Sequence, residues 1–355
     1  MSIETLIRQT NPLMPDGVTS GDSDVPRELL DEILATPFRR TIRPRPSLIA
    51  AGLVVVAVAA VVVTQALPGP VNAPQPASAA AELHNLSTVV SSLRADTLAP
   101  GQYVYTDSVS SYPPAHPGVV PYNVQFDLTR QFWVASDGSG HGVFTASNVT
   151  FPTAQDRAEW VAQGSPDIAA QFTGTSTFGP GNYGPMKVDE FTLPANQAQL
   201  SSVIAGLVTS ATHTQPGTPG YTNAEFGYIG QLLQETAAPP DVRAALLTLA
   251  GSIPGITLVG PDSAPEGVSG VGFSTPITPL SNTDPPGGGY SEELIFDPST
   301  GSLAAIEQWR TDASGTKTLE QWTSYLASGV VSNTSTTIPV STPSSTTTST
   351  AASAN

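Results

Sequence analysis

Few residues of this chain combine a reactive side chain with a spacing that catalysis or metal binding could use. None of the 355 residues is a cysteine, which excludes disulfide bonds, zinc–thiolate centres and thiol catalysis. The histidines show none of the spacings by which a helix presents two imidazoles to a metal ion, and no serine stands in a GxSxG motif. They are His84, His116, His141 and His213. The sequence therefore predicts no catalytic residue, no metal ligand, no cofactor-binding residue and no bound cofactor.

Two pairs of adjacent carboxylates are the remaining candidates for acid–base chemistry, Asp189 with Glu190 and Glu292 with Glu293. Neighbouring side chains of a strand point to opposite faces, so we expect neither pair to form a dyad and interpret both as solvated. Residues 179–184 match the GxGxxG pattern of dinucleotide-binding loops. We expect this run to follow no strand and to open no helix, and Pro180 removes a backbone donor, so a plain turn is favoured.

The longest apolar segment, residues 47–67, contains 21 residues without a charge, and eleven of them are Leu, Ile or Val. About 20 such residues cross the roughly 30 Å hydrocarbon core of a bilayer, so the segment is predicted to be a transmembrane helix. The alternatives are a buried helix of a globular core, and a cleaved signal peptide with its cleavage site near 77–79. The segment has no polar face and 46 residues precede it, which favours the membrane span.

Basic residues predict the orientation of this span. Arginines gather just before it, and no further Lys or Arg occurs until Arg94. They are Arg39, Arg40, Arg43 and Arg45. The positive-inside rule then places residues 1–46 in the cytoplasm. We expect a single-pass protein of the cell membrane that contacts the lipid bilayer through its span, with the N-terminus cytoplasmic and the C-terminal domain extracytoplasmic.

The cytoplasmic segment, residues 1–46, contains one predicted amphipathic helix at 25–35. Its apolar stripe consists of Leu29, Leu30, Ile33 and Leu34. A helix of eleven residues is marginal in water, so the stripe would rest on the membrane, pack on a partner or fluctuate. Residues 1–46 are therefore the candidate contact for a cytoplasmic protein partner.

Beyond the span, a Pro/Ala/Gly linker at 68–78 leads into a domain predicted at 79–331. The Ser/Thr-rich residues 332–355 have no apolar content to bury and are expected to be disordered. Alternating patterns on either side of the central helices predict two groups of strands, whereas residues 151–190 show little periodicity. Helical periodicity occurs near 79–98, 196–209, 223–235 and 242–253. Asn223 is the expected N-cap of the third of these helices. The fold class is therefore α+β: an extracytoplasmic domain with a curved antiparallel β-meander and about three to four helices.

Two patterns refine this domain. The tripeptide EQW occurs at 307–309 and again at 320–322, which we interpret as one position on adjacent strands of a meander rather than as a duplication. Aromatic residues alternate on the predicted strands and favour a sheet core, although a strongly curved sheet over helices could instead enclose a cavity for an extracytoplasmic ligand. They are Tyr103, Tyr105, Phe126, Phe132, Trp133 and Phe144.

The chain carries a formal charge of −16 and has a pI of about 4.4. This excludes a general nucleic-acid binder, because neutralising phosphates requires clustered Lys and Arg. The acidity belongs almost wholly to the residues beyond the span, which hold 22 acidic and 7 basic side chains. There it favours solubility and repels anionic lipid headgroups.

The segments LIRQTNPL and RELLDEILATP, the arginine cluster and the single span together resemble a family of actinobacterial single-pass membrane proteins. The outer segments PGQYVYT, QFWVASDGSGH, FTLP, residues 226–260 and EELIFDPSTGSL are similar to the same family, which is named after the locus tag CU044 of its founding member. The resemblance covers nearly the whole chain apart from 151–190 and the tail. Many members are encoded beside extracytoplasmic-function sigma factors, so it implies a sensor or regulatory role, and it supplies no catalytic residues.

Two main hypotheses of function follow. The first is a non-enzymatic, membrane-anchored extracytoplasmic protein that binds a ligand or protein and is accessory to sigma-factor regulation. The alternative is a tethered carrier of lipid or another hydrophobic ligand, with a curved sheet like that of lipoprotein carriers. A hydrolase is a third hypothesis, which the lack of any nucleophile or metal motif disfavours.

Overall fold

The computed structural model describes residues 78–93, 98–112, 120–181, 192–234, 238–279 and 288–339, which all belong to one compact unit. The predicted cytoplasmic segment, the predicted span at 47–67, the linker up to residue 77 and residues 340–355 lie outside this part of the chain. No helix in the described ranges is both long and apolar enough to cross a bilayer.

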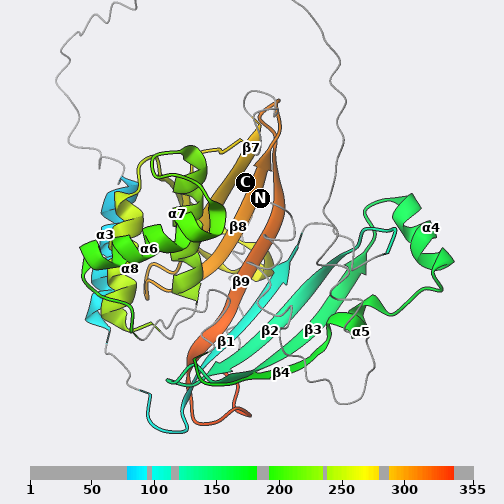
Figure 1. The fold of residues 1–355 in the computed structure, drawn as a ribbon, viewed down its shortest axis with the longest axis horizontal. Helices are drawn as coiled ribbons and strands as arrows, with labels where there is room; N and C mark the ends of the chain where they lie inside the picture. The colour runs from blue at the N-terminus through cyan, green and yellow to red at the C-terminus, as the bar shows by residue number, and fades with distance from the viewer. Residues whose placement is uncertain are drawn as a thin grey trace, which may run out of the picture. The chain divides into compact units, whose positions relative to one another are not determined.

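Nine strands form one antiparallel sheet in the order β4-β3-β2-β1-β9-β8-β7-β6-β5 (Figure 1). Strands β1–β4 are consecutive neighbours, as are β5–β9, and the two groups meet where β1 pairs with β9. The bounds are β1 Tyr103–Ser111, β2 Gln125–Val134, β3 Gly140–Thr150, β4 Gly174–Phe178, β5 Thr257–Ser263, β6 Ser269–Ser274, β7 Gly289–Phe296, β8 Leu303–Thr311 and β9 Lys317–Val331. The α+β class and the antiparallel meander in two strand groups are confirmed.

The described part of the chain has six α-helices and one short 3-10 helix, more than the expected three to four. They are α3 Ala79–Ser92, α4 Ala154–Ala162, α5 Ile168–Phe172, α6 Gln197–Thr212, α7 Pro219–Gln234, α8 Pro240–Ser252 and η2 Pro265–Gly267. The additional α4 and α5 lie in the stretch of weak periodicity at 151–190. Each begins at a side-chain cap, Thr153 for α4 and Asp167 for α5. Helix α5 has five residues and α4 nine, so the apolar side chains that they pack on the sheet, such as Ile168 and Trp160, are too few to repeat as a helical pattern in the sequence.

Two helix boundaries differ from the sequence prediction. Helix α3 ends at Ser92 rather than near Leu98, because its last serines bond back to carbonyls of their own helix and the chain then becomes extended. Helix α7 begins at Pro219, so Asn223 lies inside the helix and is not its N-cap. The Asn223 side chain instead accepts a hydrogen bond from Thr275 Oγ1 at 2.6 Å, which ties α7 to the end of β6.

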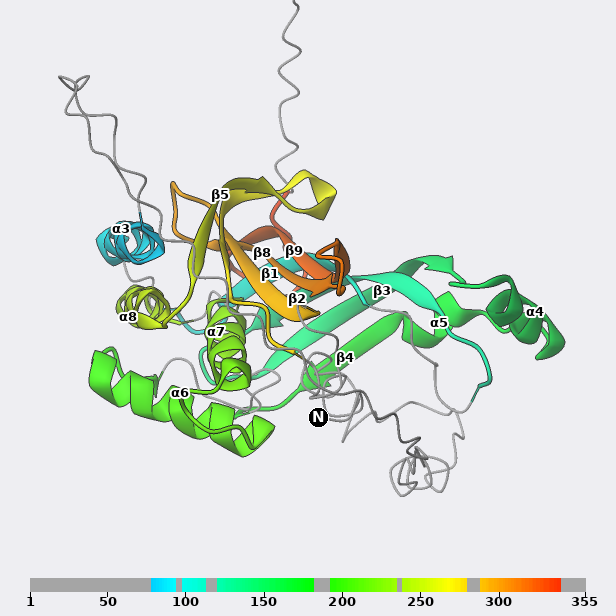
Figure 2. The same cartoon turned by 90° about the horizontal axis from the view of Figure 1, so that it is seen from above.

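Helices α3, α6, α7 and α8 pack over one face of the β5–β8 half of the sheet (Figures 1 and 2). Because α6–α8 connect β4 at one edge with β5 at the other, the chain crosses the sheet on this side. Glycines let α7 approach β7 closely: a Cβ at Gly230 would lie 2.7 Å from Leu294 Cδ2. We call the side of the sheet that carries Leu294 the helix face, and the opposite side the outer face.

A row of directly paired residues runs across the helix face of eight strands. The row consists of Leu258, Phe273, Leu294, Ile306, Thr323, Ser110, Leu128 and Ala146. It is apolar at both ends, where it joins the two halves of the core. Its two central members, on β9 and β1, carry hydroxyl groups, so the middle of the helix face is polar.

The strand aromatics pack as parts of the sheet core on both faces. Tyr105 and Trp133 lie together on the outer face, with ring centroids 5.1 Å apart. Phe132 and Phe144 form an edge-to-face pair on the helix face at 5.5 Å. The interpretation as sheet core is therefore confirmed for these four side chains.

The residues that follow β9 also contact the outer face. Trp133 Nε1 donates to the carbonyl oxygen of Thr336 at 2.8 Å, and Ile338 packs on the cluster of Tyr105 and Trp133. The domain therefore extends past residue 331, into the first residues of the segment expected to be a tail.

Candidate functional site

Three carboxylates from three different strands meet on the outer face: Asp262 of β5, Glu293 of β7 and Glu307 of β8. One oxygen atom of each lies within 4.8 Å of the others. Glu293 and Glu307 are only 3% and 2% exposed, whereas Asp262 is partly buried. None of the three forms an ion pair with a described residue. We call this group the carboxylate cluster.

Strand register and one glycine bring the cluster together. Glu293 stands directly opposite Glu307 in the β7–β8 ladder, which places both side chains on one face. Asp262 must reach Glu293 across β6, where Gly272 presents no side chain. A Cβ at Gly272 would lie 2.5 Å from Glu293 Oε1 and 3.5 Å from Asp262 Cβ. Gly272 therefore provides the space in which the two carboxylates approach each other.

The environment favours the neutral form of both glutamates. Burial, a hydrogen bond with Asp262 and the charges of Asp262 and Glu307 raise the pKa of Glu293 to about 8, against a smaller opposite effect of Lys317. Burial raises the pKa of Glu307 to about 7, although the indole of Trp309, which donates to Glu307 Oε2 at 2.9 Å, opposes this. The two glutamates thus hold protons at a pH where an exposed carboxyl group would have lost them.

One oxygen of the cluster lacks a donor. Glu293 Oε1 is fully buried and accepts no hydrogen bond from any N–H or hydroxyl group of the described residues. Two carboxyl groups can form a hydrogen bond with each other only when one of them carries a proton. The neighbouring Asp262 therefore satisfies Glu293 only when one of these two groups is protonated. An ionised Glu293 would therefore have an unsatisfied charge in a buried position.

The sequence predicted no metal ligand and did not anticipate this cluster, whose members are separated by 31 and 14 residues. The pair of Glu292 and Glu293 does point to opposite faces, as expected. Glu292 lies on the helix face, where its Oε2 would be 2.5 Å from a Cβ at Gly227 of α7. The expectation that Glu293 is solvated is wrong, because the β5–β6 segment covers it.

A second polar group is buried at the centre of the helix face. Arg130 of β2 is 3% exposed, and its Nη2 donates to Ser110 Oγ at 2.6 Å. That hydroxyl shares a hydrogen bond with Thr323 Oγ1 at 2.8 Å, whereas Arg130 Nε has no hydrogen-bond partner among the residues that the structure describes. The residues that stand opposite Arg130 on the adjacent strands are Ser108 and Phe144. In the described part of the chain no acidic side chain pairs with this guanidinium.

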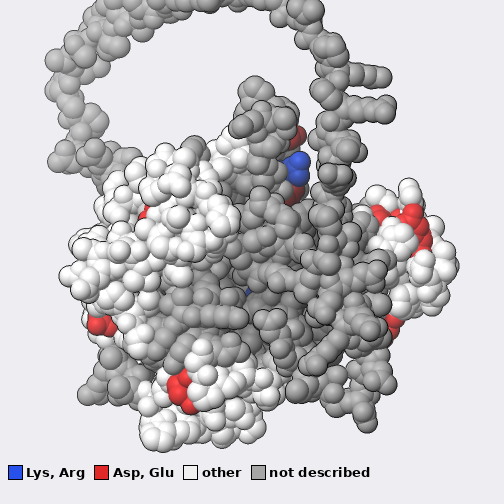
Figure 3. Space-filling view, in the orientation of Figure 1, with Lys and Arg blue, Asp and Glu red and all other residues white. Residues whose placement is uncertain are grey.

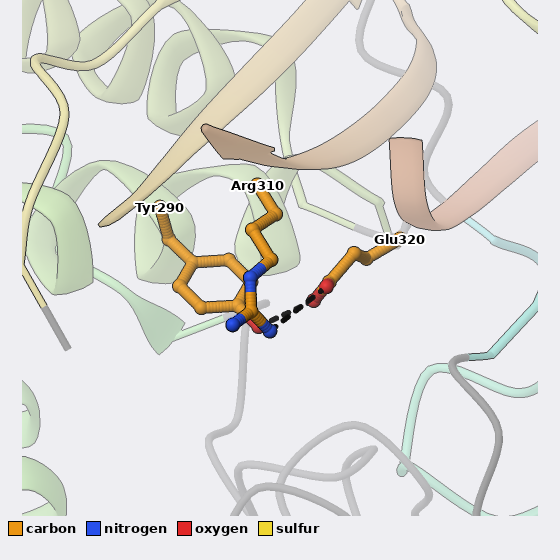
Figure 4. A network of polar contacts seen from close by, with 3 residues as sticks. All are labelled: Tyr290, Arg310 and Glu320. Atoms are coloured by element: carbon orange, nitrogen blue, oxygen red, sulfur yellow. Dashed lines mark hydrogen bonds and ion pairs between the residues drawn. The ribbon is translucent and has the colours of Figure 1, made fainter. Parts of the chain in front are cut away.

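A third group of polar side chains, Tyr290, Arg310 and Glu320, is bonded together near the surface (Figure 4). The Tyr290 hydroxyl donates to Glu320 Oε2, and Arg310 Nη1 lies 3.3 Å from Glu320 Oε1. The guanidinium carbon lies 5.9 Å from the centre of the Tyr290 ring. Burial and the bond to Glu320 raise the pKa of Tyr290 to about 12. This network joins the ends of β7, β8 and β9, and its Arg310 side chain remains about half exposed.

The structure does not assemble the described histidines into a site. His84 lies on α3, His141 on β3, and His213 ends α6 in a left-handed conformation. His116 lies outside the described residues. The three placed histidines belong to separate elements, as the isolated spacing indicated.

The glycine-rich run at 179–184 begins directly after β4, so the expectation that it follows no strand is wrong. Its first residues form part of a turn, in which the Gly181 amide donates to the Asp137 carbonyl at 2.9 Å. The run's last three residues lie outside the described ranges.

Charged side chains are sparse on the described surface of the face drawn in Figure 3. Acidic groups gather there over α4, and the described surface of this face has no extended basic patch. This agrees with the negative charge of the chain.

No protein-family model matches the chain, and no curated protein matches it either. A solved structure with detectable similarity is one of lipovitellin, determined for its lipid–protein interactions. That match has 10% sequence identity and a TM-score of 0.19, and it covers 69% of this chain and 27% of the lipovitellin chain. The chain thus spans about a quarter of the length of that protein, and similarity at this TM-score establishes neither a shared fold nor a shared function.

Proposed function

We propose that this protein is a non-enzymatic, membrane-anchored extracytoplasmic binding or sensor protein. The anchoring is supported by the uncharged segment at 47–67, by the arginines before it and by the acidic α+β domain that follows. The role in binding rests on one observation, the buried guanidinium of Arg130.

An arginine buried with a single hydroxyl partner destabilises the ligand-free protein. Removing a charge from water costs several kcal/mol, and one hydrogen bond to Ser110 offsets only part of this. Groups that weaken the folded state in this way are typical of functional sites, because a ligand can supply the missing interaction. An anionic group that binds Arg130 Nε would do so here.

A topology reporter tests the anchoring. An enzyme that is active only outside the membrane, fused after residue 355, should be active, and the same enzyme fused before residue 1 should be inactive. Fluorescent reporters that require the cytoplasm should give the opposite pattern. Cytoplasmic activity at the C-terminus would overturn the proposed topology.

Signalling towards the cytoplasm would use residues 1–46, and the resemblance to proteins encoded beside sigma factors points to such a partner. Site-specific crosslinking from the predicted apolar stripe at Leu30 tests this contact in the full chain. A crosslinked sigma factor supports regulation. If no cytoplasmic protein is crosslinked, the sensor role fails and a tethered binding protein remains.

The second candidate function is a tethered carrier of a hydrophobic ligand, and the composition of the helix face favours it. Arg130 donates to Ser110, a central polar member of a row that is apolar at both ends, an arrangement that suits an amphiphilic anion such as a fatty acid. Mass spectrometry of the full chain, purified in mild detergent, should then detect a co-purifying anionic lipid. Arg130→Met should lose it, and Arg157→Met, a change at an exposed arginine of α4, should retain it. A wild-type protein free of lipid would end the carrier hypothesis.

A further inference from the structure

We propose that Asp262, Glu293 and Glu307 form a binding site for a hard divalent cation, Ca²⁺. This site would lie on the outer face, on the opposite side of the sheet from Arg130, and it goes beyond the function proposed above. The residues come from β5, β7 and β8, so a bound cation would connect an edge strand to the interior of the sheet.

Burial distinguishes this cluster from the acidic groups that are common on protein surfaces. Glu293 and Glu307 are almost wholly removed from water. Glu293 Oε1 has no donor, and its position over Gly272 directs it towards Asp262, into the centre of the cluster. A buried oxygen without a donor, facing two further carboxylates, is the arrangement that a cation completes.

The type, number and burial of the ligands favour calcium. Three carboxylates from three strands converge where two of them are buried, and Ca²⁺ takes about 6–8 oxygen ligands in a flexible geometry. Mg²⁺ requires a near-ideal octahedral geometry, keeps several of its waters and is usually held by only one or two carboxylates. The cluster offers neither the imidazole nor the thiolate ligands that zinc and copper prefer, and carboxylate oxygens suit hard cations.

The surroundings hold two of the ligands in place. The Trp309 indole donates to Glu307 Oε2 at 2.9 Å and leaves the other oxygen of that carboxylate for a cation. Ser324 Oγ donates to the Pro265 carbonyl at 2.8 Å, which holds the β5–β6 connection against β9 and keeps Asp262 over the cluster. Asp262 is the most exposed of the three ligands, so an ion and its remaining waters would enter from that side.

Charge balance also favours an ion. The cluster contains three carboxyl groups, and among the described residues Lys317, the basic group that lowers the pKa of Glu293, is exposed and forms no ion pair with it. A divalent cation would take the place of the protons on Glu293 and Glu307 and balance the charge of their ionised forms.

Terbium luminescence tests the site with the full chain in detergent micelles. Tb³⁺ binds calcium sites and is excited by nearby indoles, and Trp309 is bonded to one ligand while Trp322 stands opposite the same residue. We expect tryptophan-sensitised emission that saturates at one Tb³⁺ per chain. Ca²⁺ should displace the ion at concentrations at least tenfold lower than Mg²⁺. Absence of saturable emission, or equal displacement by both ions, would overturn the assignment.

Two isosteric variants locate the ion. Glu293→Gln should weaken Tb³⁺ and Ca²⁺ binding at least tenfold. Glu266→Gln, a change at an exposed glutamate in the neighbouring η2 turn, should leave it unaltered. The Glu293→Gln chain should melt in EDTA at least as high as the wild type, because the neutral amide mimics the protonated acid. Unchanged binding by this folded variant would contradict the proposal.

Discussion

Glu293 and Glu307 stand directly opposite each other on β7 and β8, and both are buried. Like charges at directly opposed positions destabilise a sheet, and burial increases the repulsion. The fold therefore accommodates this pair only with protons or with a cation. Protonation is reflected in the raised pKa values, about 8 for Glu293 and about 7 for Glu307. The proposed calcium site would supply the cation.

Glu292 immediately precedes Glu293 on β7. It should make the stability of the domain fall as pH rises. Burial raises its pKa from 4.5 to about 8, so between these values the folded state holds a proton that the unfolded state releases. The stabilising contribution is complete below pH 4.5 and is lost as pH rises through about 8. Thermal melts of the full chain in EDTA should therefore show a falling midpoint from pH 5 to pH 9.

Glu292→Gln isolates this contribution, since the amide cannot ionise. Its midpoint should fall less steeply with pH than that of the wild type, whereas Glu266→Gln should follow the wild-type curve. Equal slopes for the wild type and Glu292→Gln would show that Glu292 is solvated in the folded state.

The network of Tyr290 and Glu320 makes a spectroscopic prediction. Burial is the largest cause of the raised pKa of Tyr290 and the bond to Glu320 the next, so Glu320→Gln should lower the pKa from about 12 but leave it above 10. Absorbance titration of phenolate formation should show one tyrosine ionising earlier in this variant. Tyr290→Phe in the same background should abolish the difference, and a difference that persists would assign it to another tyrosine.

The sequence predicted neighbouring strands where short turns join them, as for β2 with β3 and β8 with β9, but it did not predict β4, which two helices separate from β3. The two EQW tripeptides illustrate the pairing of β8 with β9: Glu307 stands opposite Trp322 and Gln308 opposite Gln321, so the copies lie side by side on adjacent antiparallel strands, as predicted. The pairing of β1 with β9 has no local signal, since about 200 residues separate the strands. It depends on tertiary packing, which periodicity does not contain.

The carboxylate cluster escaped prediction for the same reason. The alternation of side chains along β7 correctly predicts that Glu292 and Glu293 lie on opposite faces of the sheet. It does not reveal which residues cover Glu293. That depends on the β5–β6 segment and on Gly272, whose missing side chain is meaningful only once β6 is known to pass between Asp262 and Glu293. A glycine between two acidic strands is the signal that could have suggested the site.

Two glycines should respond to alanine in opposite directions. A Cβ at Gly270 of β6 would lie 2.3 Å from the Phe296 carbonyl oxygen, so backbone must move, and Gly270→Ala should cost about 1–3 kcal/mol. Gly206 of α6 has no atom within 4 Å of its Cβ position, so Gly206→Ala should add about 0.5–1 kcal/mol through helix propensity. Urea unfolding of the full chain measures both changes. If Gly270→Ala leaves the free energy of unfolding unchanged, β6 and β7 are less closely apposed than described.

Arg130 should lower the stability of the ligand-free chain while it supports the binding of an anionic ligand. Replacing a buried, unpaired charge with an apolar side chain of similar volume removes its desolvation cost, so Arg130→Met should stabilise the ligand-free chain by about 1–4 kcal/mol. Arg157→Met on the exposed surface should change stability by less than about 0.5 kcal/mol. Chemical unfolding after removal of lipid by extraction measures both variants. If Arg130→Met instead destabilises the lipid-free chain, the guanidinium serves the packing of β1, β2 and β9 through Ser110, and its burial then gives no support to an anionic ligand on the helix face.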